Sequence, residues 1–123
     1  MTKQRLRLGK LGEDLALKKI EELGYRCIVR NYRCSLGEVD LIARDGDTLV
    51  FLEIKTRKGK SLGYAKEAID GRKRRQLSKV ALAYLKANEC CEVKSRFDVV
   101  AINLNRDDEV EFEVIKNAFE LAY

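Results

Sequence analysis

Hydrophobic residues near the start of the chain recur at the spacing of an amphipathic helix. The apolar face of this predicted helix would consist of Leu8, Leu11, Leu15, Ala16, Ile20 and Leu23. Gly24 follows at the position where a glycine commonly ends a helix. The same period returns in the second half of the chain, at Leu77, Val80, Ala81, Tyr84 and Leu85. This second pattern predicts a helix over residues 70–87.

Elsewhere apolar and polar residues follow strand-like patterns. We expect strands over residues 26–31, 38–43, 48–55, 96–104 and 110–115. The polar run 31–37 should end the first strand, and residues 59–63 read as a basic loop. Asp45-Gly46 is a typical two-residue hairpin turn, which would pair Arg44 with Asp47. With a further turn at residues 105–108, the order is α-β-β-β-α-β-β, a mixed sheet flanked by helices in one domain over residues 1–123. This order fits α/β or α+β.

The amino-acid composition limits the catalytic groups that the protein can use. The 123 residues include 25 Lys and Arg, 20 Asp and Glu, and no histidine. Catalysis by Ser-His-Asp or Cys-His groups and histidine metal sites are therefore excluded. No apolar stretch is long enough to cross a membrane, and the basic N-terminus lacks the apolar region of a secretory signal. The four cysteines form no C-x-x-C pair, which favours free thiols in a reducing cytoplasm.

Positive charge is concentrated in one segment. Residues 55–79 contain ten basic and two acidic residues. Lys73 and Arg74 extend the apolar stripe of the second helix backwards by one turn, so we expect them beside the sheet. The segment is either a solvated helix face or a rim that binds phosphate groups, and the net charge of +5 favours an anionic partner.

The most informative segment is the predicted hairpin on either side of Asp45-Gly46. Its expected register places Asp40 opposite Phe51 and Glu38 opposite Glu53. Asp40 and Glu53 would then be diagonal neighbours, with Cα atoms about 7–8 Å apart. Because side chains alternate along a strand, Lys55 shares the face of these acids. The opposite face would carry the apolar residues Val39, Leu41, Leu52 and Ile54.

Carboxylates that face one another across a strand pair repel each other. A hard cation such as Mg²⁺ or Mn²⁺ would turn this repulsion into binding energy. Lys55 would add a positive charge that orients or helps to deprotonate a water molecule, or that neutralises charge on a phosphate. The alternative is a solvent-facing hairpin whose acids pair with Lys and Arg.

Asp40 followed by Glu53-Ile54-Lys55 on the next strand resembles the PD-(D/E)xK nuclease superfamily, and the whole chain resembles its YraN-like family of small bacterial proteins. Residues 12–13, 37–40, 51–57 and 96–100 carry the resemblance, which covers nearly the full length. Val39 stands where the name-giving motif has proline. The resemblance implies an α/β restriction-endonuclease-like fold.

The resemblance also implies roles for individual residues. Asp40, Glu53 and the backbone carbonyl of Ile54 would bind Mg²⁺ or Mn²⁺, and Lys55 would be the catalytic lysine. Glu13 would supply a further carboxylate from the first helix, where an acid is otherwise ordinary because the helix dipole favours it. Gln76 lies where some superfamily members carry a helper glutamine, but no spacing supports that role here.

Three functions are compatible with the sequence. The first is a metal-dependent endonuclease or resolvase-like phosphodiesterase acting on structured nucleic acid, DNA rather than RNA, with homodimers formed through the edge strand 110–115. Its nucleic-acid backbone contacts would come from Arg57, Lys58, Lys60, Arg72, Lys73 and Arg74. The second is a nucleic-acid-binding accessory module without turnover. The third is an interaction domain whose acids form a network of salt bridges.

Overall fold

The computed structural model describes residues 3–58, 69–89, 92–104 and 109–120; of residues 3–9, 57 and 58 it describes the backbone alone. In chain order the elements are α1 (Lys3–Glu22), β1 (Arg26–Cys34), β2 (Gly37–Asp45), β3 (Thr48–Lys58), α2 (Gly71–Ala87), β4 (Ser95–Leu104) and β5 (Val110–Phe119). This order confirms the prediction. The basic loop expected at 59–63 and the turn at 105–108 lie outside the described residues.

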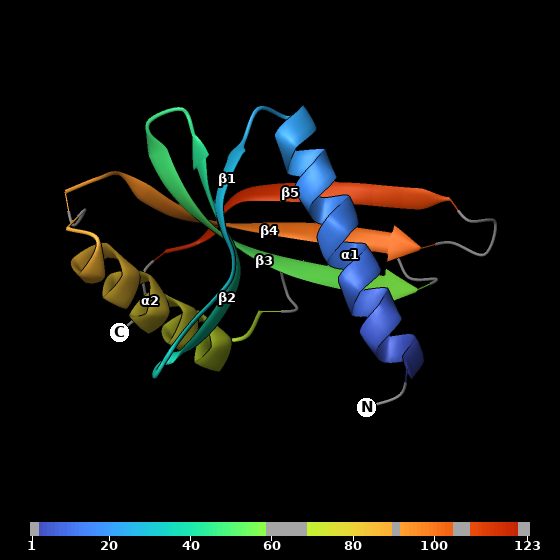
Figure 1. The fold of residues 1–123 in the computed structure, drawn as a ribbon, viewed down its shortest axis with the longest axis horizontal. Coiled ribbons are helices and arrows are strands. Elements are labelled where there is room, and N and C mark those ends of the chain that lie inside the picture. Colours follow the sequence, from blue (N-terminus) through green and yellow to red (C-terminus); the bar gives the residue numbers. More distant parts are fainter. Residues whose placement is uncertain (1–2, 59–68, 90–91, 105–108, 121–123) are drawn as a thin grey trace.

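All five strands form one sheet in the order β1-β2-β3-β4-β5 (Figure 1). β3 and β4 are parallel and the other neighbours are antiparallel, so the sheet is mixed, as predicted. A parallel pair needs a crossover connection, and α2 lies in the segment that connects β3 to β4. β5 is an edge strand, as expected. The fold is α/β.

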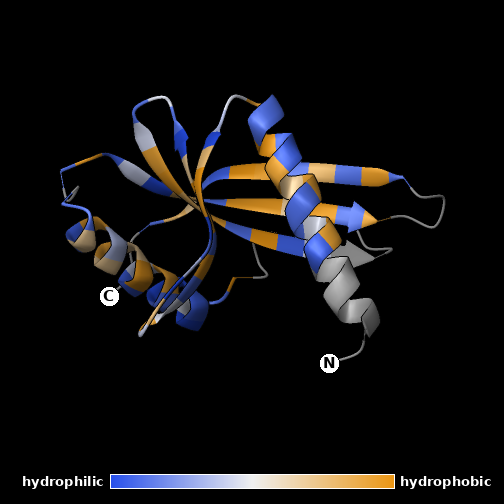
Figure 2. Ribbon diagram, in the orientation of Figure 1, coloured by the Kyte–Doolittle hydropathy of each residue, from blue (hydrophilic) through white to orange (hydrophobic). Residues whose placement is uncertain are grey.

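The two helices cover opposite faces of the sheet. Beneath α1 the core contains Ala16, Ile20, Leu41, Ala43, Val50, Leu52, Val100 and Ile102. Beneath α2 it contains Ile42, Leu49, Phe51, Leu77, Val80, Tyr84, Phe97 and Val99. Because both faces are covered, the interior strand β4 is buried from residue 97 to residue 103 without alternation. Hydrophobic residues dominate the strands that pass behind α1, whereas the first turns of α2 are hydrophilic (Figure 2). No helix in the described part of the chain is long and apolar enough to cross a membrane.

The β2–β3 hairpin differs in register from the prediction. Asp45 pairs with Thr48 and Arg44 with Leu49, so Gly46 and Asp47 are the central turn residues. Only Gly46 of these two has a positive φ, 63°. A positive φ at the first central residue is typical of a type II′ turn, which prefers glycine there. The expected pairing of Arg44 with Asp47 is therefore wrong by two residues.

The β1–β2 hairpin is longer than predicted. β1 continues through the polar run to Cys34, and only Ser35 and Leu36 form the turn. Asn31 has a φ of 52°, which interrupts the regular strand. On the neighbouring segment of β2, Val39 packs beneath α2, whereas Leu41 packs beneath α1. The prediction that Val39 shares a core face with Leu41, Leu52 and Ile54 is therefore wrong.

Candidate active site

The acidic pair lies where β2 and β3 separate. Their pairing extends only as far as Leu41 opposite Leu52. Beyond it, the backbone N–H of Ile54 donates to Oδ2 of Asp40 at 2.8 Å, so a side chain takes the place of a backbone acceptor. In the continued register Asp40 faces Glu53 directly. The predicted diagonal relation therefore does not hold, and the two carboxyl groups are close enough to interact through charge and a hydrogen bond.

Glu53 is buried, with 8 % of its surface exposed. Its Oε2 atom is buried and has no hydrogen-bond partner among the described residues. The pKa of Glu53 is raised to about 8, first by burial and then by the charge and hydrogen bonding of Asp40, against the opposing charges of Lys73 and Lys55. At neutral pH this carboxyl therefore retains its proton unless a cation replaces that proton.

The opening beside Asp40 is a pocket of about 350 Å³, lined by Glu13, Asp40, Ile54, Lys55 and Thr56. It brings together three of the four predicted catalytic residues, from α1, β2 and β3. The fourth, Glu53, lies next to Asp40 but does not line the pocket.

Helix α1 reaches this pocket because Gly12 has no side chain. A Cβ atom at Gly12 would stand 2.1 Å from Oγ1 of Thr56 on β3. Glu13, the next residue, accepts a hydrogen bond from Nδ2 of Asn31 at 2.8 Å, and its Oε1 lies 3.8 Å from Arg30. Glu13 is therefore held at the pocket by its hydrogen bond to Asn31, the irregular residue of β1.

The acids here do not form a three-ligand cluster. No group of three or more His, Cys, Asp or Glu side chains suited to a metal ion occurs among the described residues. Asp40 and Glu53 remain a pair, with Glu13 on another wall. Two carboxylates, one with a buried unpartnered oxygen, fit a hard cation that takes its remaining oxygen ligands from water, substrate or a backbone carbonyl such as that of Ile54.

The predicted basic residues separate into different groups. Arg72 and Lys73 line a groove between α2 and the β1–β2 turn. Arg74 instead donates to the carbonyl of Ile69 at 3.0 Å and lies over the ring of Phe119, which secures the start of α2. The side chains of the other three predicted contacts, Arg57, Lys58 and Lys60, lie outside the described residues.

Glu38, Cys27 and Cys34 lie outside the candidate site. Glu38 forms an exposed ion pair with Arg33 across the β1–β2 hairpin, with 3.0 Å between Oε2 and Nε. Cys27 and Cys34 are free and half-buried, as expected of thiols, and the other two cysteines lie outside the described residues.

Sequence reasoning missed the residues that position the acids. Gly12 and Thr56 define the approach of α1, and Asn31 links β1 to Glu13. The one signal available was an asparagine inside a strand pattern, because asparagine tolerates positive φ better than most residues. The close contact between helix and strand leaves no periodic trace in the sequence.

The segment 96–100, which contributes to the family resemblance, contains a buried hydrogen-bond network. Asp98 is 1 % exposed and accepts hydrogen bonds from the hydroxyl of Tyr25 at 2.7 Å, from Arg96 at 2.9 Å and from the backbone of Asn117 at 2.9 Å. Arg96 also pairs with Asp45 at the β2–β3 turn. This network joins β2, β4 and β5, and its central residue Asp98 pairs with Leu52, the residue before Glu53 on β3.

A mixed sheet with one helix on each face, and with acids where two strands diverge, agrees with the restriction-endonuclease-like fold that the sequence resemblance implies. The model of the uncharacterised protein family UPF0102 matches residues 12–102, and the chain belongs to this family. The predicted YraN-like resemblance is thereby confirmed.

Relatives of similar length support this assignment. UPF0102 proteins of Geobacter sulfurreducens and Syntrophus aciditrophicus are 52 % and 48 % identical, over 94 % and 98 % of this chain and 91 % and 94 % of their own. A UPF0102 protein of Moorella thermoacetica is 44 % identical over 97 % of this chain and 100 % of its own. Among solved structures, Pyrococcus furiosus SfsA in complex with Ca²⁺ has a TM-score of 0.40 and 16 % identity, over 92 % of this chain and 63 % of that chain.

Proposed function

We propose that this protein is a metal-dependent phosphodiesterase, an endonuclease or resolvase-like enzyme that acts on structured nucleic acid. The observation that carries the proposal is the buried Oε2 of Glu53, which lacks a hydrogen-bond partner among the described residues and lies beside the Asp40 carboxylate. An unpartnered buried oxygen destabilises a fold, and a cation bound there would relieve that cost.

Asp40, Glu53 and the carbonyl of Ile54 would hold Mg²⁺ or Mn²⁺, with Glu13 as a further carboxylate. Such an ion supplies Lewis-acid chemistry to a phosphodiester and lowers the pKa of water. Lys55, which shares the pocket with Asp40 and Glu13, orients the attacking water or neutralises charge that develops on the phosphate. The N–H of Ile54 donates to Oδ2 of Asp40 and so fixes the Asp40 carboxylate beside Glu53.

The test is cleavage of labelled substrates: single-stranded, duplex, flap and four-way-junction DNA, and RNA, each with Mg²⁺, Mn²⁺ or EDTA. Asp40→Asn and Lys55→Ala should abolish metal-dependent cleavage. Glu38→Gln is the matched control, because Glu38 is an exposed acid on the same hairpin that is engaged with Arg33. Cleavage by wild type that persists in EDTA, or that survives Asp40→Asn, would refute the proposal.

The second candidate function is an accessory module that binds nucleic acid without cutting it. The groove that contains Arg72 and Lys73 favours it, because this groove requires no metal. In that case binding remains salt-sensitive, no substrate is cut, and Asp40→Asn leaves function intact. A preference for DNA over RNA, a homodimer and a cytoplasmic location belong to the proposal; the substrate panel and sedimentation of the protein test the first two.

A further inference from the structure

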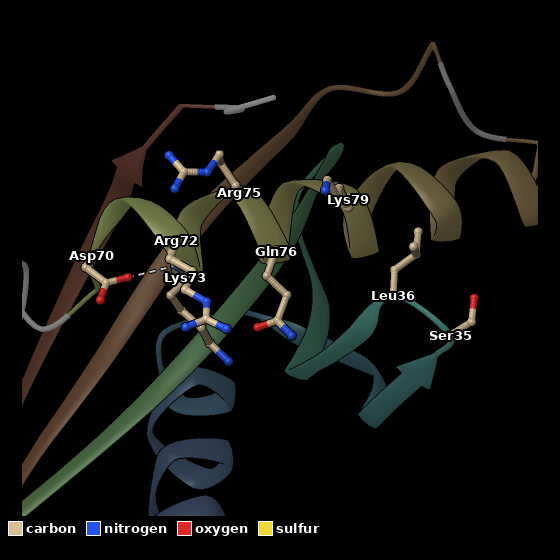
Figure 3. Close-up of a pocket in the computed structure, with 8 residues that line it drawn as sticks. All are labelled: Ser35, Leu36, Asp70, Arg72, Lys73, Arg75, Gln76 and Lys79. Atoms are coloured by element: carbon tan, nitrogen blue, oxygen red, sulfur yellow. Dashed lines mark hydrogen bonds between the residues drawn. The ribbon is translucent and has the colours of Figure 1, made fainter.

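A groove of about 660 Å³ separates the start of α2 from the turn of the β1–β2 hairpin (Figure 3). It is lined by Ser35, Leu36, Asp70, Arg72, Lys73, Arg75, Gln76 and Lys79. In the close-up, Arg72, Lys73 and Gln76 extend from one side of α2, and Leu36 extends from the hairpin toward the helix. The groove thus has a polar wall on α2 and a wall on the hairpin with an apolar tip.

The helical wall carries uncompensated positive charge. Arg72, Arg75, Gln76 and Lys79 follow the spacing i, i+3, i+4, i+7 and therefore form one stripe along α2. None of the four cations that line the groove forms an ion pair with another residue that the structure describes. Its one acid, Asp70, is occupied as the N-cap, accepting from the N–H of Lys73 at 2.9 Å. An anionic chain complements such a wall.

The groove continues toward the acidic pair. Lys73 and Gln76 also line an adjoining pocket of about 350 Å³ with Gly37 and Glu38. Lys73 lies close enough to act electrostatically on Glu53. The side chain of Gln76 packs on Gly37, where a Cβ atom would stand 2.7 Å from Nε2. The hairpin turn and α2 are therefore in contact beside the site where cleavage is proposed.

Leu36 is the apolar feature of the groove. Its side chain is at the hairpin tip and 48 % exposed. In a continuous duplex the base faces stack on one another, so a leucine among cations would meet only sugars and phosphates. An unpaired base offers an apolar face, and inserted apolar side chains are a known means of holding bases apart.

We propose that this groove binds the backbone of a nucleic-acid strand whose bases are unpaired, with its phosphates along Arg72, Arg75 and Lys79 and a base face against Leu36. The inference rests on the proposed function and deepens it, because it assigns the substrate as a strand at a branch, flap or frayed end rather than as continuous duplex.

The charge of the groove is tested by binding in EDTA, which separates binding from cleavage. Labelled single-stranded, flap and duplex DNA are titrated at 50–200 mM salt with Lys79→Glu and with Lys86→Glu, an exposed lysine in the last turn of the same helix. Lys79→Glu should weaken binding of single-stranded and flap DNA about tenfold and reduce the salt slope by about one, whereas Lys86→Glu should not. Equal effects of the two variants would overturn the groove assignment.

The preference for unpaired bases is tested at Leu36. Leu36→Ala should weaken binding of flap DNA about threefold or more and abolish the fluorescence change of 2-aminopurine placed at the branch, while duplex binding stays constant. The control is Leu23→Ala, because Leu23 is exposed to a similar extent, 50 %, after α1. If wild type binds duplex as tightly as flap DNA, or if both alanine variants behave alike, the substrate assignment is wrong.

The two proposals fail in distinguishable ways. If Lys79→Glu weakens binding but the protein shows no metal-dependent cleavage, the groove assignment stands and the proposed enzymatic function is wrong. If cleavage requires Asp40 but binding is unchanged by the substitutions at Lys79 and Leu36, the enzymatic function stands and the groove assignment is wrong.

Discussion

The buried carboxyl of Glu53 predicts how the stability of the metal-free protein depends on pH. Its pKa rises from 4.5 to about 8 on folding, mainly because of burial. Between these two values the folded state binds a proton that the unfolded state releases, so stability falls as pH rises through this window. Below pH 4.5 both states are protonated, and above about pH 8 the full penalty applies.

The magnitude follows from the same shift. At 1.36 kcal/mol per pH unit, the difference sets an upper limit of roughly 5 kcal/mol. Because part of the shift comes from the charge and hydrogen bonding of Asp40, we expect about 2–4 kcal/mol from the burial of Glu53 itself. Glu53→Gln removes the titrating group, so this variant should be more stable than wild type by about that amount at pH 8, and nearly equal to it at pH 4.5.

The assay is urea unfolding in EDTA at several pH values from 4.5 to 9, for wild type, Glu53→Gln and the exposed control Glu38→Gln. Addition of Mg²⁺ at pH 8 should stabilise wild type and not Glu53→Gln, because binding to the folded state alone raises stability. A stability difference between wild type and Glu53→Gln that is the same at pH 4.5 and pH 8 would refute the reasoning.

Further predictions concern the contacts that hold the site and the sheet. Gly12→Ala should lower the free energy of unfolding by about 1–3 kcal/mol and reduce metal-dependent cleavage, because its Cβ would collide with Thr56 and displace α1. Urea unfolding and cleavage rates measure the two effects. Unchanged values would show that α1 does not need to approach β3 this closely. Asp98→Ala should cost about 3–5 kcal/mol, because it leaves Arg96 and the Tyr25 hydroxyl short of a partner in a partly buried network; a thermal unfolding midpoint equal to that of wild type would contradict this.

The sequence predicts the elements well because their burial is periodic. Leu77, Val80 and Tyr84 recur at helical spacing and are buried beneath α2, and Ala16 and Ile20 are buried beneath α1. Leu11 and Leu23, predicted on the same apolar face of the first helix, are instead 48 % and 50 % exposed. Such spacing reports which face of a helix is covered, and this suffices for the order of helices and strands. The sequence also brought Asp40 and Glu53 onto neighbouring strands, but not the break in alternation at Asp40 that puts Val39 and Leu41 on opposite faces.

The register itself was not predictable from the turn dipeptide. Asp45-Gly46 suits a two-residue turn, but Gly46-Asp47 suits a type II′ turn equally well, and the choice depends on how the whole hairpin packs. The long β1–β2 hairpin was missed for a related reason. Its residues 31–37 are polar, yet Tyr32 and Cys34 pack against the core beneath α2, and this tertiary contact overrides the local pattern.

The position of the acids explains how the fold accommodates them. Within a continuous β2–β3 ladder, two facing carboxylates would repel one another while every backbone amide was already paired. Where the strands separate, the amide of Ile54 loses its strand partner, and the Asp40 carboxylate satisfies it. One acid thus becomes part of the backbone hydrogen bonding, and the unfavourable burial falls on Glu53 alone. A proton or a cation relieves that burial, so a cation bound here would contribute to the stability of the fold as well as to chemistry.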